Sequence, residues 1–178
     1  ADATYVVHGV KCIFRLPDAL TFEDGALIDP ASIALHCANR GGVAPGDTVA
    51  ITGPGAIGLL AGDAALARGA GRVIVIGRGE RLAKAAALGF ETVDYAAEDP
   101  AEAVRRMTGG LGADVALECA GVPEAVRWCL ALLRRGGRCA AVGIPVVGVE
   151  IAMQRLVLDE LELAGVRASA GEMRRVMP

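Results

Sequence analysis

The sequence predicts an α/β protein built on one doubly wound, parallel sheet of about six strands with helices on both faces. Two observations support this fold class. Between residues 48 and 142, five short apolar runs alternate with four helical segments, a pattern typical of a parallel sheet. The run at residues 72–76 also lacks a polar face, as expected for a strand covered on both sides.

The segment before this alternation is expected to contain both strands and helices. Residues 4–7 and 12–16 have the composition of short strands. Thr21 precedes an acid by three positions, the arrangement of a capping box, so a short helix should begin there. Asp29-Pro30 is expected to open a second helix, because proline suits the first helical position, and Gly41-Gly42 should end it.

The alternating elements follow in order and are separated by glycine-containing turns. A turn at residues 45–47 leads into the first of them. Strands are predicted at 49–51, 72–76, 91–95, 114–119 and 138–142, and helices at 59–68, 80–88, 99–108 and from Pro123 to Arg134-Arg135. After residue 144 we expect a loop and extended piece at 145–153, a helical turn at 154–159, a strand at 161–166 and a helix beginning at Ala170.

Composition limits the function classes. The 178 residues suit one domain with a substantial core, and 53% of them are apolar. A net charge of −3 argues against nucleic-acid binding, and the longest uncharged run, 48–62, is too short to span a bilayer. The five cysteines form no C-x-x-C pair, which favours a reduced, cytoplasmic setting over a disulfide framework. The chain opens on Ala1, so we expect a piece of a longer protein.

The most informative motif is the turn that contains Gly53, Gly55 and Gly58. An apolar strand precedes these glycines and a helix follows them. Such a turn lets the backbone approach a pyrophosphate, and the N–H groups of Ala56 and Ile57 at the helix start would face it. Glycine-rich turns that bind nothing are also common, and Gly58 alone would be explained by close packing of helix on strand.

Residues at the end of the second strand bear on which dinucleotide would bind. NAD-type folds place an acid roughly 20 residues after the glycines to accept the ribose hydroxyls. Gly77, 19 residues after Gly58, has no carboxylate, and Arg78 with Arg81 could hold a 2′-phosphate. We therefore favour NADP slightly. The alternative is that Arg78 is a solvated loop charge, and Glu80 offers the ribose a carboxylate, so NAD stays open.

Five stretches carry a resemblance to a known family: L-I-D-P-A-S-I-A-L-H at 27–36, P-G-D-T-V-A-I-T-G-P-G-A-I-G at 45–58, E-C-A-G at 118–121, L-R-R-G-G-R at 133–138 and V-G-I-P at 142–145. Together they resemble the coenzyme domain of medium-chain, zinc-dependent alcohol dehydrogenases, in the branch of the polyol and threonine dehydrogenases. The resemblance implies a remnant of the catalytic domain at 1–28, a Rossmann-type NAD(P)-binding domain at 29–167 and a truncated return to the catalytic domain at 168–178.

The resemblance also implies roles for individual residues. Cys119, Ala120 and Gly121 would put backbone groups near the riboses, and Val142, Gly143 and Ile144 would line the nicotinamide pocket; ordinary strand-end turns are the alternative for both segments. Asp29 corresponds to a position that the family sets at the catalytic zinc, although a helix N-cap is the more economical interpretation here. His36 is best explained as a structural histidine. The family's other zinc ligands are absent, so zinc belongs only to the complete enzyme, and no catalytic residue is assigned to this chain.

The resemblance predicts a parent enzyme that transfers hydride between a secondary alcohol or polyol and NAD(P), of which this fragment alone is inactive. Two alternatives are a zinc-independent quinone or enoyl reductase of the same superfamily and a non-catalytic dinucleotide-sensing module. A methyltransferase is disfavoured because its acidic ribose contact is missing. The edge strand at 161–166 is expected to pair across a two-fold axis in a dimer or tetramer. The sequence does not name the alcohol.

Overall fold

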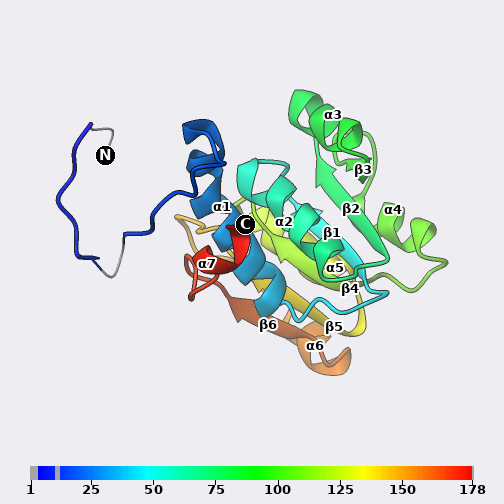
Figure 1. The fold of residues 1–178 in the computed structure, drawn as a ribbon. Coiled ribbons are helices and arrows are strands. Elements are labelled where there is room, and N and C mark those ends of the chain that lie inside the picture. Colours follow the sequence, from blue (N-terminus) through cyan, green and yellow to red (C-terminus); the bar gives the residue numbers. More distant parts are fainter. Residues whose placement is uncertain (1–3, 11–12, 178) are drawn as a thin grey trace.

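The computed structural model describes residues 4–10 and 13–177, and it contains a six-stranded sheet in the order β3-β2-β1-β4-β5-β6 (Figure 1). All strand pairs are parallel. The elements are α1 (Phe22–Arg40), β1 (Thr48–Thr52), α2 (Ala56–Ala67), β2 (Arg72–Gly77), α3 (Gly79–Ala87), β3 (Glu91–Asp94), α4 (Pro100–Met107), β4 (Ala113–Glu118), α5 (Pro123–Leu132), β5 (Leu133–Ala141), α6 (Met153–Leu158), β6 (Glu162–Gly165) and α7 (Met173–Val176). The predicted doubly wound parallel sheet is confirmed.

The core forms on both faces of the sheet because successive strand side chains point in opposite directions. In β1, Val49 and Ile51 belong to the apolar cluster that α1 and α2 cover. Ala50, between them, belongs to a second cluster that includes Ala103 and Val104 of α4. Buried residues of α5 and β5 make a third cluster. The small side chains of this Ala- and Val-rich sequence therefore build two layers, one on each side of the strands.

The strand order reverses at β1, which lies between β2 and β4. Thr52, the last residue of β1, is level with Ile76 of β2 and Glu118 of β4. The carboxyl ends of these three strands therefore open onto one edge of the sheet. In doubly wound sheets a crevice forms at such a switch point, and ligands bind there.

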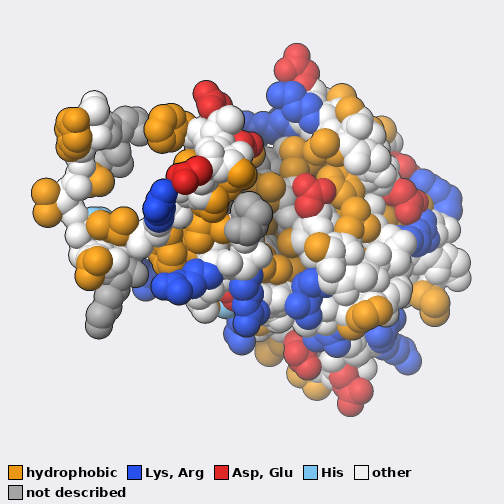
Figure 2. Space-filling model, viewed as in Figure 1, with side chains coloured by type: hydrophobic (Ala, Val, Ile, Leu, Met, Phe, Trp, Pro, Cys, Tyr) orange, Lys and Arg blue, Asp and Glu red, His pale blue; other side chains and the backbone are white. Residues whose placement is uncertain are grey.

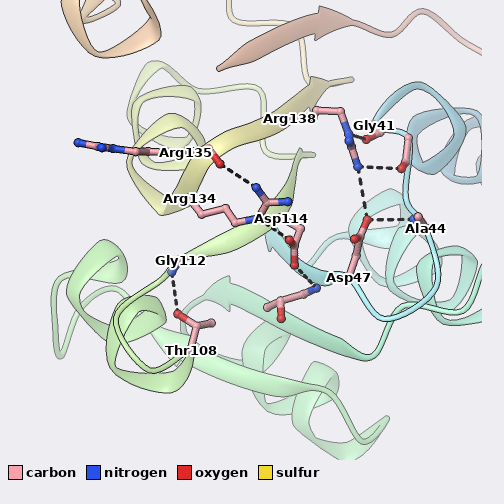
Figure 3. Close-up of polar contacts among 11 residues, drawn as sticks. Gly41, Ala44, Asp47, Thr108, Gly112, Asp114, Arg134, Arg135 and Arg138 are labelled. Carbon is pink, nitrogen blue, oxygen red and sulfur yellow. Dashed lines mark hydrogen bonds and ion pairs between the residues drawn. The ribbon is translucent and has the colours of Figure 1, made fainter. Parts of the chain in front are cut away.

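The opposite edge, where the strands begin, is held by charged side chains (Figure 3). Asp114 at the start of β4 accepts hydrogen bonds from the Thr48 N–H at 2.8 Å and from Arg134 Nε at 2.5 Å. Arg138 donates to the carbonyl oxygens of Gly41 and Gly42, both at 3.0 Å. These contacts tie the loop after α1 and the starts of the strands together, away from the switch point.

Helix α1 is a single 19-residue helix, so the predicted break at Asp29-Pro30 is wrong. The capping box at Thr21 is confirmed, since its hydroxyl accepts from the Asp24 N–H at 3.1 Å and its N–H donates to the Asp24 carboxylate at 2.9 Å. Pro30 lies within the helix and removes one backbone donor. The cap fixes the first half, and burial of Ala34, Cys37 and Ala38 fixes the second, so the helix continues through the proline.

Arg134 and Arg135 lie in β5 and not in the last turn of a helix, so the predicted end of α5 is also wrong. Helix α5 stops at Leu132, and Leu133 is already extended, with φ −72° and ψ 144°. Leu133 is buried and pairs with Ala113 of β4. The ladder and the ion pair of Arg134 with Asp114 outweigh the local helical signal.

The strands expected near the N-terminus are not formed in the described part of that segment. Residues 4–10 and 13–16 have no strand assignment, and Cys12, the first residue of the second predicted strand, lies outside the described residues. This segment runs apart from the sheet (Figure 1), with exposed hydrophobic side chains along it (Figure 2), Tyr5 and Val7 among them. A strand needs a neighbour to accept its hydrogen bonds, and residues 4–10 and 13–16 pair with no strand of the described sheet.

Later elements agree with the expectations, with α7 beginning at Met173, three residues after the predicted start at Ala170. Helix α7 packs beside α1 (Figure 1). Among the helices of the described residues, none combines the length and the apolar character required to cross a membrane.

Candidate dinucleotide-binding site

The glycine turn joins β1 to α2 with very close backbone packing. Gly53 has φ +92°, in the left-handed region, and a Cβ there would lie 2.8 Å from the Ala120 nitrogen. A Cβ on Gly58 would collide with the carbonyl oxygen of Gly53. These two glycines are therefore required by packing within the turn, which agrees with the packing explanation for Gly58.

Gly55 differs from the other two glycines. It is the N-cap of α2, and a Cβ there would meet no atom within 4 Å. Among the described residues, no side chain caps this helix. The start of α2, to which Ala56 and Ile57 belong, thus offers backbone N–H groups and a positive dipole end beside open space. This cradle fits a pyrophosphate.

A cleft of about 940 Å³ lies against this turn at the carboxyl ends of β1 to β4. It brings together seven of the residues that the sequence proposed, namely Gly53, Gly55, Gly77, Arg78, Arg81, Cys119 and Ala120. Its lining also includes Glu80, the carboxylate that the sequence offered to a ribose, and residues that the sequence did not assign: Thr52, Pro54, Gly79, Tyr95, Val122, Glu124, Ala125 and Trp128. The other proposed residues, Ala56, Ile57, Gly58, Gly121, Val142, Gly143 and Ile144, are not part of this lining.

The wall at the ends of β2 and β3 is aromatic and basic. The Arg78 guanidinium lies over the Tyr95 ring, 5.6 Å from its centroid, and Tyr95 contacts Trp128 with ring centroids 4.9 Å apart. A Cβ on Gly77 would lie 2.6 Å from Pro54 Cδ. The lack of a side chain at Gly77 therefore lets the glycine turn pack against β2.

Glu118, the last residue of β4, is fully buried. Its Oε1 accepts hydrogen bonds from the N–H groups of Ala120 and Gly121, both at 2.8 Å. Burial raises the pKa of this carboxyl, and the N–H groups of Gly121, Ala120 and Gly143 offset part of that effect. Two N–H groups of the 119–121 turn are therefore used internally. Sequence reasoning quoted Glu118 within E-C-A-G but did not assign it, and an acid at the end of an apolar strand was the available signal.

The 142–144 segment follows β5 and packs beside the 119–121 turn. The main-chain oxygen of Glu118 accepts from Val142 at 2.9 Å and from Gly143 at 3.1 Å. A Cβ on Gly143 would lie 2.5 Å from Gly121 Cα, so the two turns touch. Ile144 is 82% exposed. The segment thus presents an apolar side chain on the outer side of the switch point.

Asp29 lies in the middle of α1, so the N-cap interpretation of this residue is wrong. It lines a separate, mainly apolar cavity of about 510 Å³ with Phe14 and Met173. Within residues 4–10 and 13–177, no three His, Cys, Asp or Glu side chains come together in a way that could hold a metal ion. Asp29 could therefore serve as a metal ligand only beside residues that this part of the chain does not contain.

His36 is partly buried and contacts Glu172, an arrangement consistent with the expected structural role. Its Nδ1 lies 3.0 Å from Glu172 Oε1, and the exposed fractions of the two side chains are 14% and 8%. Burial alone would raise the pKa of Glu172, but hydrogen bonds from the Ala170 N–H, its own N–H, His36 and Asn39 together lower it. The pair fastens the segment before α7 to α1.

The four described cysteines are free thiols, and Cys37, Cys129 and Cys139 are buried. At the cleft, a hydrogen bond with Cys37 and burial raise the pKa of the Cys119 thiol well above its ordinary value. A thiolate nucleophile is therefore not expected there.

Comparison with known proteins agrees with this Rossmann-type fold. Residues 56–178 match the family model described as zinc-binding dehydrogenase. The chain belongs to this zinc-binding dehydrogenase family.

Among the relatives, sorbitol dehydrogenase of Bacillus subtilis (strain 168) is 42% identical over 147 residues, which cover 82% of this chain and 42% of that protein. Human sorbitol dehydrogenase is 34% identical over 163 residues, which cover 89% of this chain and 46% of the human protein. The chain thus spans about half the length of the curated relatives that it matches.

Solved structures give the same picture. The crystal structure of 2R,3R-butanediol dehydrogenase from Bacillus subtilis matches with a TM-score of 0.85 and 33% identity, covering 92% of this chain and 47% of that one. A zinc-binding dehydrogenase from Sinorhizobium meliloti 1021 bound to NADP matches with a TM-score of 0.83 and 33% identity. The match covers 91% of this chain and 49% of that one.

Proposed function

We propose that this chain is the NAD(P)-binding domain of a zinc-dependent alcohol or polyol dehydrogenase, which transfers hydride between a secondary alcohol and the nicotinamide. One observation carries the proposal: the glycine turn leaves open space at Gly55, beside an uncapped helix start at the switch point of the sheet. Family membership and the polyol dehydrogenase relatives support the substrate class. In this proposal, residues 1–28 and 168–178 belong to the catalytic domain and 29–167 to the cofactor domain, with α1 running across the first boundary.

Each part of the site has a role in binding. The turn at Gly53–Gly58 and the start of α2 hold the pyrophosphate, and the Arg78 side of the cleft holds the adenosine end. The 142–144 segment lies on the nicotinamide side and shields it from water with apolar surface. The bound nicotinamide supplies the hydride acceptor, and zinc supplies a Lewis acid in the complete enzyme. Since Asp29 is the one metal-side residue proposed here, the chain alone should bind cofactor and oxidise nothing.

We infer a preference for NADP from the basic wall of the cleft. Arg78 and Arg81 both line it, and the stack on Tyr95 holds the Arg78 guanidinium at the edge where a 2′-phosphate would lie. A charge-assisted, bidentate contact with a phosphate is the interaction that an arginine makes best. Glu80 lines the same wall and would oppose a phosphate, which makes the preference modest.

Titration of the chain with NADH and NADPH tests both proposals. NADPH should bind more tightly, and Arg78→Ala should weaken NADPH about fivefold to twentyfold while changing NADH little. Arg40→Ala is the matched control, because it removes an exposed positive charge from the last turn of α1, at the other end of the sheet. Equal binding of both cofactors, unchanged by Arg78→Ala, would refute the preference. Binding of neither would refute the site.

Activity and assembly are tested separately. The chain mixed with polyols, NAD(P) and zinc should produce no reduced cofactor, and measurable oxidation would contradict the assignment of the catalytic residues to the rest of the enzyme. Strand β6 is at the edge of the sheet, so we propose that residues 161–166 pair in a dimer or tetramer. Sedimentation showing a monomer at high concentration would count against this pairing. We also infer a cytoplasmic location from the spacing of the cysteines.

A further inference from the structure

Glu118 is a buried acid for which the proposed function provides no role. It is the last residue of β4, and its side chain has an exposed fraction of 0%. Its Oε1 receives both hydrogen bonds from the 119–121 turn, while its Oε2 is buried and has no hydrogen-bond partner among the described residues. An ionisable group in so confined a place is costly to bury, so its presence calls for an explanation.

The space around the carboxyl connects three segments of the site. On one side, Ala120 packs so closely against the glycine turn that a Cβ on Gly53 would lie 2.8 Å from its nitrogen. On the other side, a Cβ on Gly143 would collide with Glu118 Oε2 and with the Gly121 nitrogen. The Glu118 side chain therefore lies where the phosphate turn, the 119–121 turn and the 142–144 segment meet.

We propose that Glu118 is a positioning residue for the nicotinamide half of the cofactor. Its carboxyl gathers the N–H groups of Ala120 and Gly121 onto one oxygen and so fixes the 119–121 turn. Because Gly121 touches Gly143, the fixed turn in turn holds the 142–144 segment at the nicotinamide side. This inference rests on the proposed function, which places the nicotinamide there.

The chemistry explains why an acid occupies this position. One carboxyl oxygen accepts two converging N–H donors, which an apolar residue of the same size would leave buried and unsatisfied. The proposed adenosine end is at Arg78 and Arg81, and within the described residues the Glu118 carboxyl makes no hydrogen bond with either arginine. Loss of the Glu118 side chain should therefore weaken binding of the whole dinucleotide more than binding of its adenosine half.

The experiment compares Glu118→Leu and Glu118→Gln in the 178-residue chain, with NADPH and with 2′,5′-ADP as the adenosine-half probe. Glu118→Leu should weaken NADPH about tenfold or more and 2′,5′-ADP less than about twofold. Glu118→Gln keeps the accepting oxygen and should bind NADPH within about threefold of the natural chain. In Gly143→Ala, the added Cβ would collide with Glu118 Oε2 and with the Gly121 nitrogen. This variant should also weaken NADPH binding more than 2′,5′-ADP binding, and it replaces Glu118→Leu if the leucine variant does not fold.

The outcomes separate the two proposals. If the natural chain binds NADPH and the folded Glu118→Leu variant binds it equally well, the positioning role is overturned and the proposed function stands. A loss of NADPH and 2′,5′-ADP by the same factor would also overturn it, since that result describes a purely structural residue. A tenfold loss of NADPH affinity in Glu118→Gln would overturn the explanation that one accepting oxygen of Glu118 fixes the 119–121 turn. Failure of the natural chain to bind either probe would refute the proposed function itself.

Discussion

Gly58→Ala tests the close packing of the phosphate turn. The added Cβ would meet the carbonyl oxygen of Gly53 well inside van der Waals contact and would lie 3.1 Å from the carbonyl carbon. That oxygen also accepts the Gly55 N–H at 2.9 Å. Because both colliding atoms are backbone, no side-chain rotation relieves the clash, and the turn itself would have to open.

Two opposing effects decide how much Gly58→Ala changes the free energy of unfolding. Replacing glycine by alanine inside a helix stabilises it by about 1 kcal/mol through backbone entropy. Overpacking commonly costs about 1–3 kcal/mol, and a rigid collision that needs a backbone retreat of about 1 Å lies at or beyond the upper end. We therefore expect the free energy of unfolding to fall by about 2 kcal/mol, with weaker cofactor binding as a consequence.

Urea unfolding followed by circular dichroism measures this change. Gly55→Ala is the matched control, because a Cβ there meets no atom within 4 Å. It should cost less than about 1 kcal/mol, the usual penalty for alanine at an N-cap, yet weaken cofactor binding because the added methyl group occupies the cradle. A Gly58→Ala chain as stable as the natural one would refute the packing of the turn, and a Gly55→Ala chain with unchanged binding would refute the cradle.

Three further predictions concern ionisable residues. The pKa of Glu172 is lowered in the folded state, so the Glu172 carboxylate stabilises the fold at pH values above its unfolded pKa, and this stability is lost as the pH falls through the folded pKa. The Glu172→Gln variant should therefore be less stable than the natural chain near neutral pH and about equally stable in acid. Urea unfolding at several pH values measures this difference. The pH dependence at Glu118 is the reverse, because its pKa is raised in the folded state and the fold therefore loses stability as the pH rises above the unfolded pKa of this group. The stability of the Glu118→Gln variant should accordingly increase relative to that of the natural chain as the pH rises. Asp114→Asn should lower the urea midpoint and leave the NADPH dissociation constant unchanged, because Asp114 lies at the other end of the sheet; a parallel loss of binding would contradict this separation.

The sheet and the glycine turn were predictable because their signals are local. Alternating apolar runs and glycine stops repeat along the chain and need no knowledge of distant partners. Two of the elements that the sequence misplaced, the break in α1 and the end of α5, depend instead on distant contacts. Pro30 stays within α1 because Thr21 caps one half and packing holds the other, and Arg134 joins β5 because Asp114, 20 residues earlier, is its partner.

The site shows the same division between local and distant causes. Strand ends predicted which segments would meet, and the cleft does bring Gly53, Arg78 and Cys119 together. The sequence did not indicate that the Gly77 position is filled by Pro54, or that Tyr95 and Trp128 complete the wall, since these contacts depend on side-chain directions across several strands. Glu118 was overlooked because its partners are main-chain groups, which leave no pattern of side-chain types.

The two ends of the sheet are stabilised in different ways, and this difference bears on function. Where the strands begin, half-exposed ion pairs and carbonyl contacts of Arg134 and Arg138 hold loops that do not line the cleft. Where they end, glycines let backbone segments touch and a single buried acid organises their N–H groups. Backbone groups are fixed in direction and carry no side-chain freedom to lose, so a site built from them is preorganised for its ligand. The close-packed glycines of the proposed binding end, Gly53, Gly58 and Gly143, should therefore tolerate no added side-chain atom, while the opposite end should accept substitutions at a cost in stability alone.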